Sequence, residues 1–468
     1  MLTRILAFGL VFFLGINFAE AQRPFITTWN SANAGITESN QIQIPGKGTD
    51  YLIEWEEVGN PVNSGSLTGN DFMIVTFPQP GIYQVRISGN FTKIRFNGGL
   101  QCTDGDCRKL LSIEQWGDIE WECMGEAFSG CTFMEYNATD VPDLSRVESM
   151  SAMFKYCNRF NGNINNWDVS NVQDMSQLFF AAANYNQRMT SWDVSNVETM
   201  EEMFFLARDF RADIRTWDTG NVRNMRRMFM DARDFNHFIG SWDVSSVENF
   251  EEMFSRALSF NQNINDWDLS SAKNMKFMFR GAESFNQPLD NWRFPKLDVD
   301  GLEGLFRDAS SFNQNINSWE VGHLESLALL FSNAINFNQP LDKWNLSNTK
   351  DLSGIFAGAT EFNQPIENWD VSNVIDMRSV FSGAFSFNQP INDWDVTNSL
   401  WLGAMFQNAE NFNQPLDNWN VSNVLSMSSM FLGASSFNQT LNDWDVSKVN
   451  NFFWMFRGAI SFNQPLNN

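Results

Sequence analysis

The sequence is poor in histidine, since only His237 and His323 occur in 468 residues. A histidine-based catalytic triad and a histidine zinc site both need that residue beside placed partners, so the parts for either are missing. Basic residues are also few: 31 Lys and Arg stand against 55 Asp and Glu, for a formal charge of -24. Such a chain repels polyanions. We therefore predict no nucleic-acid partner and favour cationic or hydroxyl-rich ones.

Long apolar runs are absent beyond the N-terminus. Residues 1–21 hold Arg4, an apolar run over 5–18 and an A-x-A pattern ending at Ala21, which together predict a secretory signal peptide and a mature chain from Gln22. No later segment reaches about 18 uninterrupted apolar residues. No cysteine that could take a lipid follows the predicted cleavage site. We predict an exported chain without membrane insertion, either secreted into the extracellular space or held at the cell surface.

Cysteine is scarce as well, with five in the chain. Cys102 and Cys107 are the candidate disulfide, because they would close a short loop and export permits oxidation. Cys131 and Cys157 fall in an alanine column of consecutive repeats, where each is either a small buried filler or half of a second bridge. Cys123 is left over, and connectivity does not follow from sequence alone.

The chain is rich in one repeat. Phenylalanine follows the repeated tryptophan by about twelve residues, and alanine follows that phenylalanine by three. A unit repeated at fixed spacing cannot bury its apolar face alone, so its copies must stack into a solenoid. The tryptophans recur every 25 residues, with one step of 27, at Trp167, Trp192, Trp217, Trp242, Trp267, Trp292, Trp319, Trp344, Trp369, Trp394, Trp419 and Trp444.

One copy shows the expected coil. Residues 362–384 read FNQPIENWDVSNVIDMRSVFSGA, and the I-x-x-W-x-V stretch predicts a short parallel strand. Val374, Met377 and Phe381 follow at i, i+3 and i+7, which predicts a short helix. We therefore predict that residues 108–468 form a repeat solenoid of leucine-rich-repeat-like α/β coils, each with a short parallel strand and a short helical turn.

The preceding segment, residues 22–107, differs in kind. Several runs alternate apolar and polar residues between Gly, Pro and Asn turn signals, which predicts short strands in a small all-β sandwich. These runs cover residues 41–44, 51–55, 73–77 and 82–87. The stretch FPQPGIYQV, residues 77–85, resembles the penultimate strand of PKD-type immunoglobulin-like domains.

Polar residues flank the tryptophan column and, in a strand, would point away from the core. We predict that they form a concave, acidic and amide-rich stripe that binds a ligand. Two other interpretations stay open. Stacked asparagine side chains can hydrogen-bond along the array in a purely structural role, which the sequence favours for the asparagine after each phenylalanine, at Asn363, Asn388, Asn413 and Asn438. Stacked aspartates can instead hold calcium, although no G-G-x-G-x-D repeat is present. The stripe comprises Asp168, Asp193, Asp243, Asp268, Asp370, Asp395 and Asp445 after the tryptophan, and Asn368, Asp393 and Asn418 before it.

The repeat carries a family resemblance. FNQPLDNWNVSNVLSMSSMFLGA, residues 412–434, is similar to the repeat of the BspA-like leucine-rich-repeat surface proteins, and the match covers residues 108–468. The resemblance implies a secreted or cell-surface protein used in adhesion or partner binding, with no catalytic residues. Residues 213–215 and 237–239 depart from the usual NQPL sequence. A ligand that contacts identical side chains in every coil would lose those contacts at these two coils.

These observations together predict a non-enzymatic adhesion protein without a cofactor, which binds an extracellular protein or glycan through the solenoid. A structural spacer that presents the N-terminal domain is the alternative, and exposed aromatics on the stripe, with Trp401 and Trp454 as candidates, would favour binding over it. A carboxylate-dependent glycan-processing enzyme is a third reading. Residues 462–466 begin another repeat, so self-association through an uncapped C-terminal coil is also expected.

Overall fold

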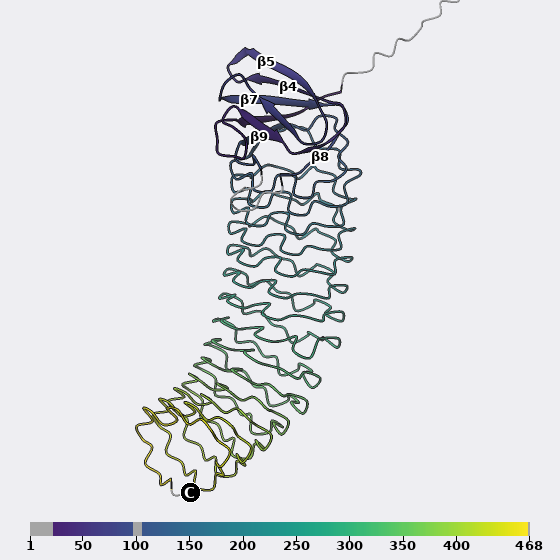
Figure 1. The fold of residues 1–468 in the computed structure, drawn as a ribbon. Helices are drawn as coiled ribbons and strands as arrows, with labels where there is room; N and C mark the ends of the chain where they lie inside the picture. The colour runs from purple at the N-terminus through teal and green to yellow at the C-terminus, as the bar shows by residue number, and fades with distance from the viewer. Residues whose placement is uncertain (1–21, 97–104, 467–468) are drawn as a thin grey trace, which may run out of the picture.

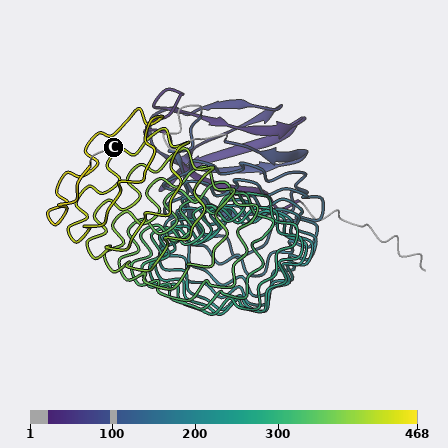
Figure 2. The ribbon, with the colours of Figure 1, turned by 90° about the horizontal axis from the view of Figure 1, so that it is seen from below.

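The computed structural model describes residues 22–96 and 105–466. Strands gather at the N-terminal end, and the remaining chain forms a bent stack of coils (Figure 1). Seen from below, successive coils follow nearly one closed outline, and the last coils are displaced where the stack bends (Figure 2). The predicted signal peptide, residues 1–21, and Cys102 lie outside the described residues.

The strands of the described residues form three sheets. The largest has the order β10-β9-β1-β7-β4-β5, and two small sheets pair β2 with β6 and β3 with β8. All pairs are antiparallel except β10 with β9. The four alternating runs predicted from the sequence all lie in strands, namely β2, β4, β6 and β7. The strands are β1 (Phe25–Asn30), β2 (Gln41–Ile44), β3 (Gly46–Gly48), β4 (Tyr51–Glu57), β5 (Asn60–Gly69), β6 (Met73–Thr76), β7 (Ile82–Ser88), β8 (Phe91–Ile94), β9 (Leu110–Gln115) and β10 (Glu135–Tyr136).

The largest sheet covers the first coil. Every second residue of β1 is buried, as expected for a strand with one face on a core. The Phe25 ring lies 5.5 Å from that of Trp116 and 5.2 Å from that of Trp121, so sheet and coils share one continuous core. The strand β9 begins after residue 107 and pairs with β1, so the sheet extends across the domain boundary predicted there.

A buried lysine fastens the segment before β2 to the start of β9. The Lys109 side chain is fully buried, and its Nζ donates to three carbonyl oxygens in residues 37–41 at 2.9 to 3.1 Å. The Asp106 carboxylate lies 3.8 Å from this Nζ. It also accepts hydrogen bonds from the backbone N–H groups of Ile36 and Gln43, at 2.9 and 2.7 Å. Each buried charge is therefore compensated by hydrogen bonds as well as by the other charge.

The predicted leucine-rich-repeat-like α/β coil is wrong. No helix occurs in residues 22–96 and 105–466, and past β10 the described coils contain single-residue parallel bridges, such as Asp376 with Trp401, instead of strands. The backbone N–H groups of Met377 and Ser379 donate to the carbonyl oxygens of Trp401 and Gly403 in the next coil, each at 2.9 Å. In a helix these groups would donate four residues back along the same chain.

Turns produce the apolar spacing that had predicted a helix. Ser379 and Gly383 have φ values of +57° and +69°, in the left-handed region, and so reverse the chain direction twice in this segment. The N–H of Ala384 donates to the carbonyl of Phe381 at 3.1 Å, which closes a tight turn. Val374, Met377 and Phe381 are all buried, so turns and a helix satisfy the same pattern of inward residues.

The predicted strand over residues 366–371 is replaced by another turn. The Trp369 N–H donates to the carbonyl of Ile366 at 3.2 Å within the same coil. The indole Nε1 of Trp369 donates to the carbonyl of Leu341 in the preceding coil at 2.9 Å. Its ring is stacked on that of Trp394, with centroids 6.2 Å apart and planes 7° apart. The tryptophan column thus links coils by both stacking and hydrogen bonds.

Asparagines form a second link between coils. The backbone N–H of Asn363 and the side-chain amide of Gln364 both donate to Oδ1 of Asn338 in the preceding coil, at 3.0 and 2.9 Å. Asn388 and Gln389 repeat the contact one coil later, on Oδ1 of Asn363. This ladder is the structural role that the sequence favoured for the asparagine after each phenylalanine, because buried polar groups need partners.

Candidate functional site

The predicted stripe lies on the surface of the coils. The tryptophans beside its members are buried, so the inward and outward alternation is present although the backbone is not a strand. All ten predicted stripe residues are exposed, namely Asp168, Asp193, Asp243, Asp268, Asp370, Asp395, Asp445, Asn368, Asp393 and Asn418.

Each stripe aspartate that follows a tryptophan caps the turn after it. Oδ1 of Asp370 accepts hydrogen bonds from the backbone N–H and the hydroxyl of Ser372, at 3.1 and 2.6 Å. Oδ1 of Asp395 accepts one from the N–H of Thr397 at 3.0 Å. This is an Asx turn, which fixes the direction of the carboxylate. The same contact, to the residue two positions on, is made by Asp168, Asp193, Asp243, Asp268 and Asp445.

The stripe residues before the tryptophan bond along the stack instead. The amide Nδ2 of Asn418 donates to Oδ1 of Asp393 in the preceding coil at 3.2 Å, and the Asn418 backbone N–H donates to Oδ1 of Asn392 at 3.1 Å. The stripe therefore combines carboxylates held within one coil and amides that join neighbouring coils.

The turn hydrogen bonds also lower the pKa of several stripe carboxyls. The Ser195 side chain, and then its backbone N–H, lower the pKa of Asp193 below its usual value. The Asp243 carboxyl is affected in the same way by Ser245, and the pKa of Asp395 is lowered by Thr397. These carboxylates stay charged at neutral pH.

We expect the stack to lose stability as the pH falls below about 4. A carboxyl with a folded pKa below the unfolded value of about 3.9 contributes stability above that value and loses it as the pH falls through the folded pKa. Urea unfolding at pH 6 and pH 3 measures the loss. The control is a triple variant, Asp193→Asn, Asp243→Asn and Asp395→Asn, because Asn345 and Asn420 cap equivalent turns naturally. The triple variant should lose less stability, and equal losses would contradict the assignment.

A polar groove follows the capped turns. It has a volume of about 820 Å³, and we call it the turn groove. His323 lines it, as do Glu325 and Lys350, whose charged groups lie 2.9 Å apart. Its edge is fixed by Asn373, whose Nδ2 donates to the carbonyl of Ser347 in the preceding coil at 2.8 Å. The turn groove offers both charges and both kinds of hydrogen-bonding group to a ligand.

The described residues show neither a metal cluster nor a membrane-spanning helix. In residues 22–96 and 105–466, no three Asp, Glu, His or Cys side chains gather closely enough to hold a metal ion. Calcium on the aspartate column therefore has no support from the arrangement of these residues. No helix there has the length and apolar character needed to cross a membrane.

The cysteines divide into two kinds. Cys107 is disulfide-bonded, and its predicted partner Cys102 lies outside the described residues. Cys131 and Cys157 are free and fully buried, so the filler interpretation of the alanine column is confirmed. Burial raises the pKa of both thiols, most strongly by removing them from water, which makes them unreactive. Cys123 is also free and is half-buried.

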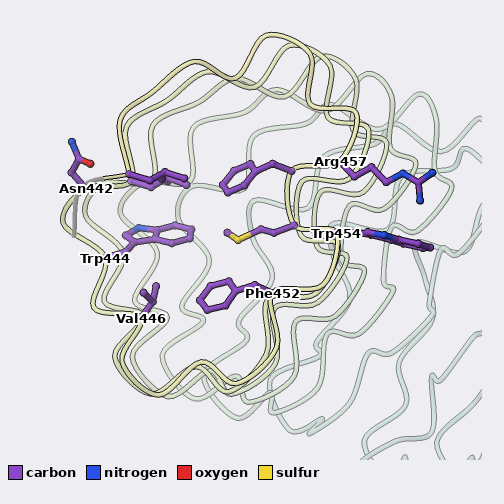
Figure 3. A pocket seen from close by; sticks show the side chains of 10 residues that line it. Asn442, Trp444, Val446, Phe452, Trp454 and Arg457 are labelled. Atoms are coloured by element: carbon purple, nitrogen blue, oxygen red, sulfur yellow. The ribbon is translucent and has the colours of Figure 1, made fainter.

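Of the two candidate aromatics, Trp401 is 37% exposed and forms parallel bridges with Asp376 and Ser426, whereas Trp454 lies away from the stripe. In Figure 3, Trp444 and Phe452 point into the interior of the last described coils, where they line a cavity of about 460 Å³. Trp454 lies outside the coil wall on the side opposite Asn442, and the Arg457 guanidinium is 4.6 Å from its ring centroid. The stripe itself is uniformly polar. Self-association through this coil stays a prediction.

The comparison with protein families matches the coils. The profile of a family described as "Mycoplasma protein of unknown function, DUF285" matches residues 122–237, 207–301, 300–408 and 393–468, which together cover most of the chain. The chain belongs to the DUF285 family. Four tandem matches along the stack make this DUF285 chain a repeat protein, and strands β1 to β9 precede the matched range. No curated protein matches this DUF285 chain.

Proposed function

We propose that this DUF285 chain is a secreted or cell-surface, non-enzymatic recognition protein that binds an extracellular protein or glycan along its coil stack. The resemblance of its repeat to BspA-like surface proteins and the signal-peptide pattern of residues 1–21 support this proposal. The observation that carries it is the ordered, exposed row of carboxylates and amides in the stripe, next in sequence to the turn groove.

Pre-organisation is the physical reason why the stripe suits binding. Asp370 and Asp395 are held by Asx turns, and Asn418 is held by two bonds to the preceding coil. A ligand that meets already ordered groups avoids much of the entropic cost of fixing side chains. Repetition then lets an extended partner meet the same chemistry once in every coil, and the buried tryptophans beside the stripe, such as Trp369 and Trp394, have ring centroids 6.2 Å apart.

The pKa values of the Asp and Glu carboxyls favour binding over catalysis. Glycan hydrolysis by a carboxyl pair needs one general acid with a raised pKa. Among the described Asp and Glu residues, every resolved pKa shift is downward, as for Asp193 and Glu248, chiefly because of hydrogen bonds from neighbouring side chains. The lowered carboxyl pKa values therefore support the proposal of binding rather than catalysis.

A structural spacer is the second candidate. It is favoured by the internal hydrogen bonds of the stripe and by the position of Trp454, which is 48% exposed but lies away from the stripe. In that role the stack would only carry the N-terminal sheet away from its point of attachment.

We expect that neutralising three stripe carboxylates weakens recognition without unfolding the protein. The variant is Asp370→Asn, Asp395→Asn and Asp445→Asn in residues 22–468, because asparagine keeps the Asx turn and removes the charge. Binding to immobilised extracellular-matrix proteins and glycans should weaken about tenfold or more, since each lost charged hydrogen bond contributes about 1.5 to 3 kcal/mol. Surface plasmon resonance with and without calcium measures this.

The control variant is Glu361→Gln, which removes an exposed charge elsewhere on the stack. It should bind like the parent protein. If the parent protein binds a ligand that the stripe variant also binds equally well, the stripe is not the recognition surface. If the parent protein binds none of the panel, the spacer role replaces recognition. The full mature chain is used because β9 pairs with β1, so a cut near residue 108 would remove part of the sheet.

A further inference from the structure

A second pocket lies on the N-terminal part of the chain, far from the stripe. It has a volume of about 330 Å³ and lies where β3 and β8 meet the loop before β6. Three cationic side chains line it, Lys47, Lys93 and Arg95, together with the ring of Phe72 and the carboxylate of Asp71. In a chain of formal charge -24, this pocket is therefore lined by more cations than acids.

The strand register places the cations on one face. Lys47 of β3 lies directly opposite Lys93 of β8, so their Cβ atoms are separated by about 5 Å. The neighbouring pair, Gly46 and Ile94, is buried, and alternate residues of a strand point to opposite faces. Arg95 follows Lys93 by two residues and is exposed, so it shares the outer face with both lysines.

The two lysines have no ion-pair partner among the described residues. Like charges directly opposite each other in a sheet are destabilising. Arg95 forms an ion pair with Glu126 at 2.6 Å, but neither Lys47 nor Lys93 forms one with any residue in the described ranges. With 55 acidic residues in the chain, an internal partner would be easy to supply. The arrangement therefore leaves two ammonium groups available for an external anion.

An exposed aromatic ring is held beside these cations. The Phe72 side chain is 63% exposed. The backbone of the preceding residue, Asp71, is fixed by its surroundings. Asp71 has a φ of +51°, its carbonyl accepts a bond from the Tyr51 hydroxyl at 2.6 Å, and its N–H donates to the Gly48 carbonyl at 3.0 Å. A non-glycine residue in the left-handed region persists only where its surroundings fix it. The loop is thus fastened in a form that presents Phe72 to solvent.

We propose that this pocket binds an acidic sugar unit of an anionic glycan. The sugar carboxylate or sulfate lies between Lys47 and Lys93, where it removes their mutual repulsion, and the apolar face of the sugar ring packs on Phe72. A volume of about 330 Å³ is at the small end of ligand sites and matches one or two sugar rings. The site lies beside the first coil, since Arg95 pairs with Glu126, but it contains no stripe residue and does not depend on the function proposed for the stripe.

Other anions fit less well. A single-stranded nucleic acid uses several aromatic rings along a basic groove, whereas only one ring lines this pocket. The negative charge of the whole chain also repels a long polyphosphate. Each unit of a short acidic glycan carries one anionic group and one apolar ring face. These match the lysine pair and the single aromatic ring of the pocket.

The test uses residues 22–468 and isothermal titration with four defined probes. These are tetragalacturonic acid for a carboxylate, a heparin-derived tetrasaccharide for a sulfate, uncharged maltotetraose, and an eight-residue oligothymidylate. We expect at least one acidic tetrasaccharide to bind and maltotetraose not to bind. The double variant Lys47→Gln/Lys93→Gln should weaken that binding at least about tenfold, and Phe72→Ala about tenfold.

Matched controls separate the pocket from general charge effects. Lys343→Gln/Lys448→Gln removes two lysines of the coil stack, and Phe385→Ala truncates another exposed ring, so both should bind like the parent protein. Equal weakening by these controls would overturn the proposal, as would tighter binding of oligothymidylate than of either acidic sugar. Undiminished binding by the pocket variants would overturn it too.

A stability measurement adds an independent readout. Lys93→Glu places opposite charges across β3 and β8, so its thermal midpoint should equal or exceed that of the parent while acidic-sugar binding is lost. A clear fall in the midpoint would refute the like-charge argument. The stripe variant should keep acidic-sugar binding at this pocket. A negative result for one site therefore leaves the proposal for the other site intact.

Discussion

Replacing Phe356 by alanine is expected to destabilise the coil stack by about 4 kcal/mol. The Phe356 side chain is fully buried, and its ring is stacked on Phe362 at 3.8 Å, Phe331 at 5.7 Å and Phe381 at 5.9 Å. Truncation removes the transfer energy of the ring and leaves a cavity that rigid neighbouring coils cannot close. Urea unfolding followed by tryptophan fluorescence measures the change, because Trp369 lies 6.0 Å from the same ring.

The matched control for this variant is Phe385→Ala. Phe385 belongs to the neighbouring coil but is 43% exposed, so its loss should change the free energy of unfolding by about 0.5 kcal/mol or less. A comparable loss in both variants would mean that the phenylalanine column does not carry the stability of the stack. Because each coil contacts only its neighbours, the Phe356 variant should also unfold locally before the rest.

Replacing Lys109 by methionine is expected to cost about 3 to 5 kcal/mol. Methionine keeps the volume of the stem but removes the charge, so three carbonyl oxygens in residues 37–41 lose a donor and Asp106 stays buried without its cation. The segment before β2 should then detach from the start of β9. Hydrogen exchange of the Gln43 N–H, which donates to Asp106, reports this opening directly.

Lys343→Met is the control, because that lysine is exposed on the stack and its loss should be nearly neutral. If Lys109→Met is equally neutral, the buried lysine is not what fastens the segment. Selective loss of protection in residues 36–43, with the coils unaffected, is the expected pattern.

The two proposed sites divide recognition between the parts of the molecule. The stripe on the coils offers fixed carboxylates, whereas the pocket at Lys47 and Lys93 offers cations and one ring. Opposite chemistry at the two places suits different ligands. The spacer role of the stack and the sugar pocket are compatible with each other, so the stripe variant and the pocket variant together decide which part of the chain recognises a partner.

Much of the surface of the coils could be predicted from the repeat. The outward position of Asp370 and the inward position of Trp369 follow from alternation and hold in the structure. The Asn363 ladder likewise follows from a polar residue repeated beside a buried ring. The sugar pocket could not be predicted, because Lys47 and Lys93 are distant in sequence and only the pairing of β3 with β8 brings them together.

The sequence by itself determined which side chains form buried columns and which form exposed rows, because a repeat of 25 residues carries that information in every copy. Only the tertiary structure decided how the backbone runs between those columns. The spacing of Val374, Met377 and Phe381 is satisfied equally by a helix and by left-handed turns. The N–H of Met377 donates to Trp401 in the next coil. A partner in another coil does not exist until coils are stacked, so local periodicity could not reveal it.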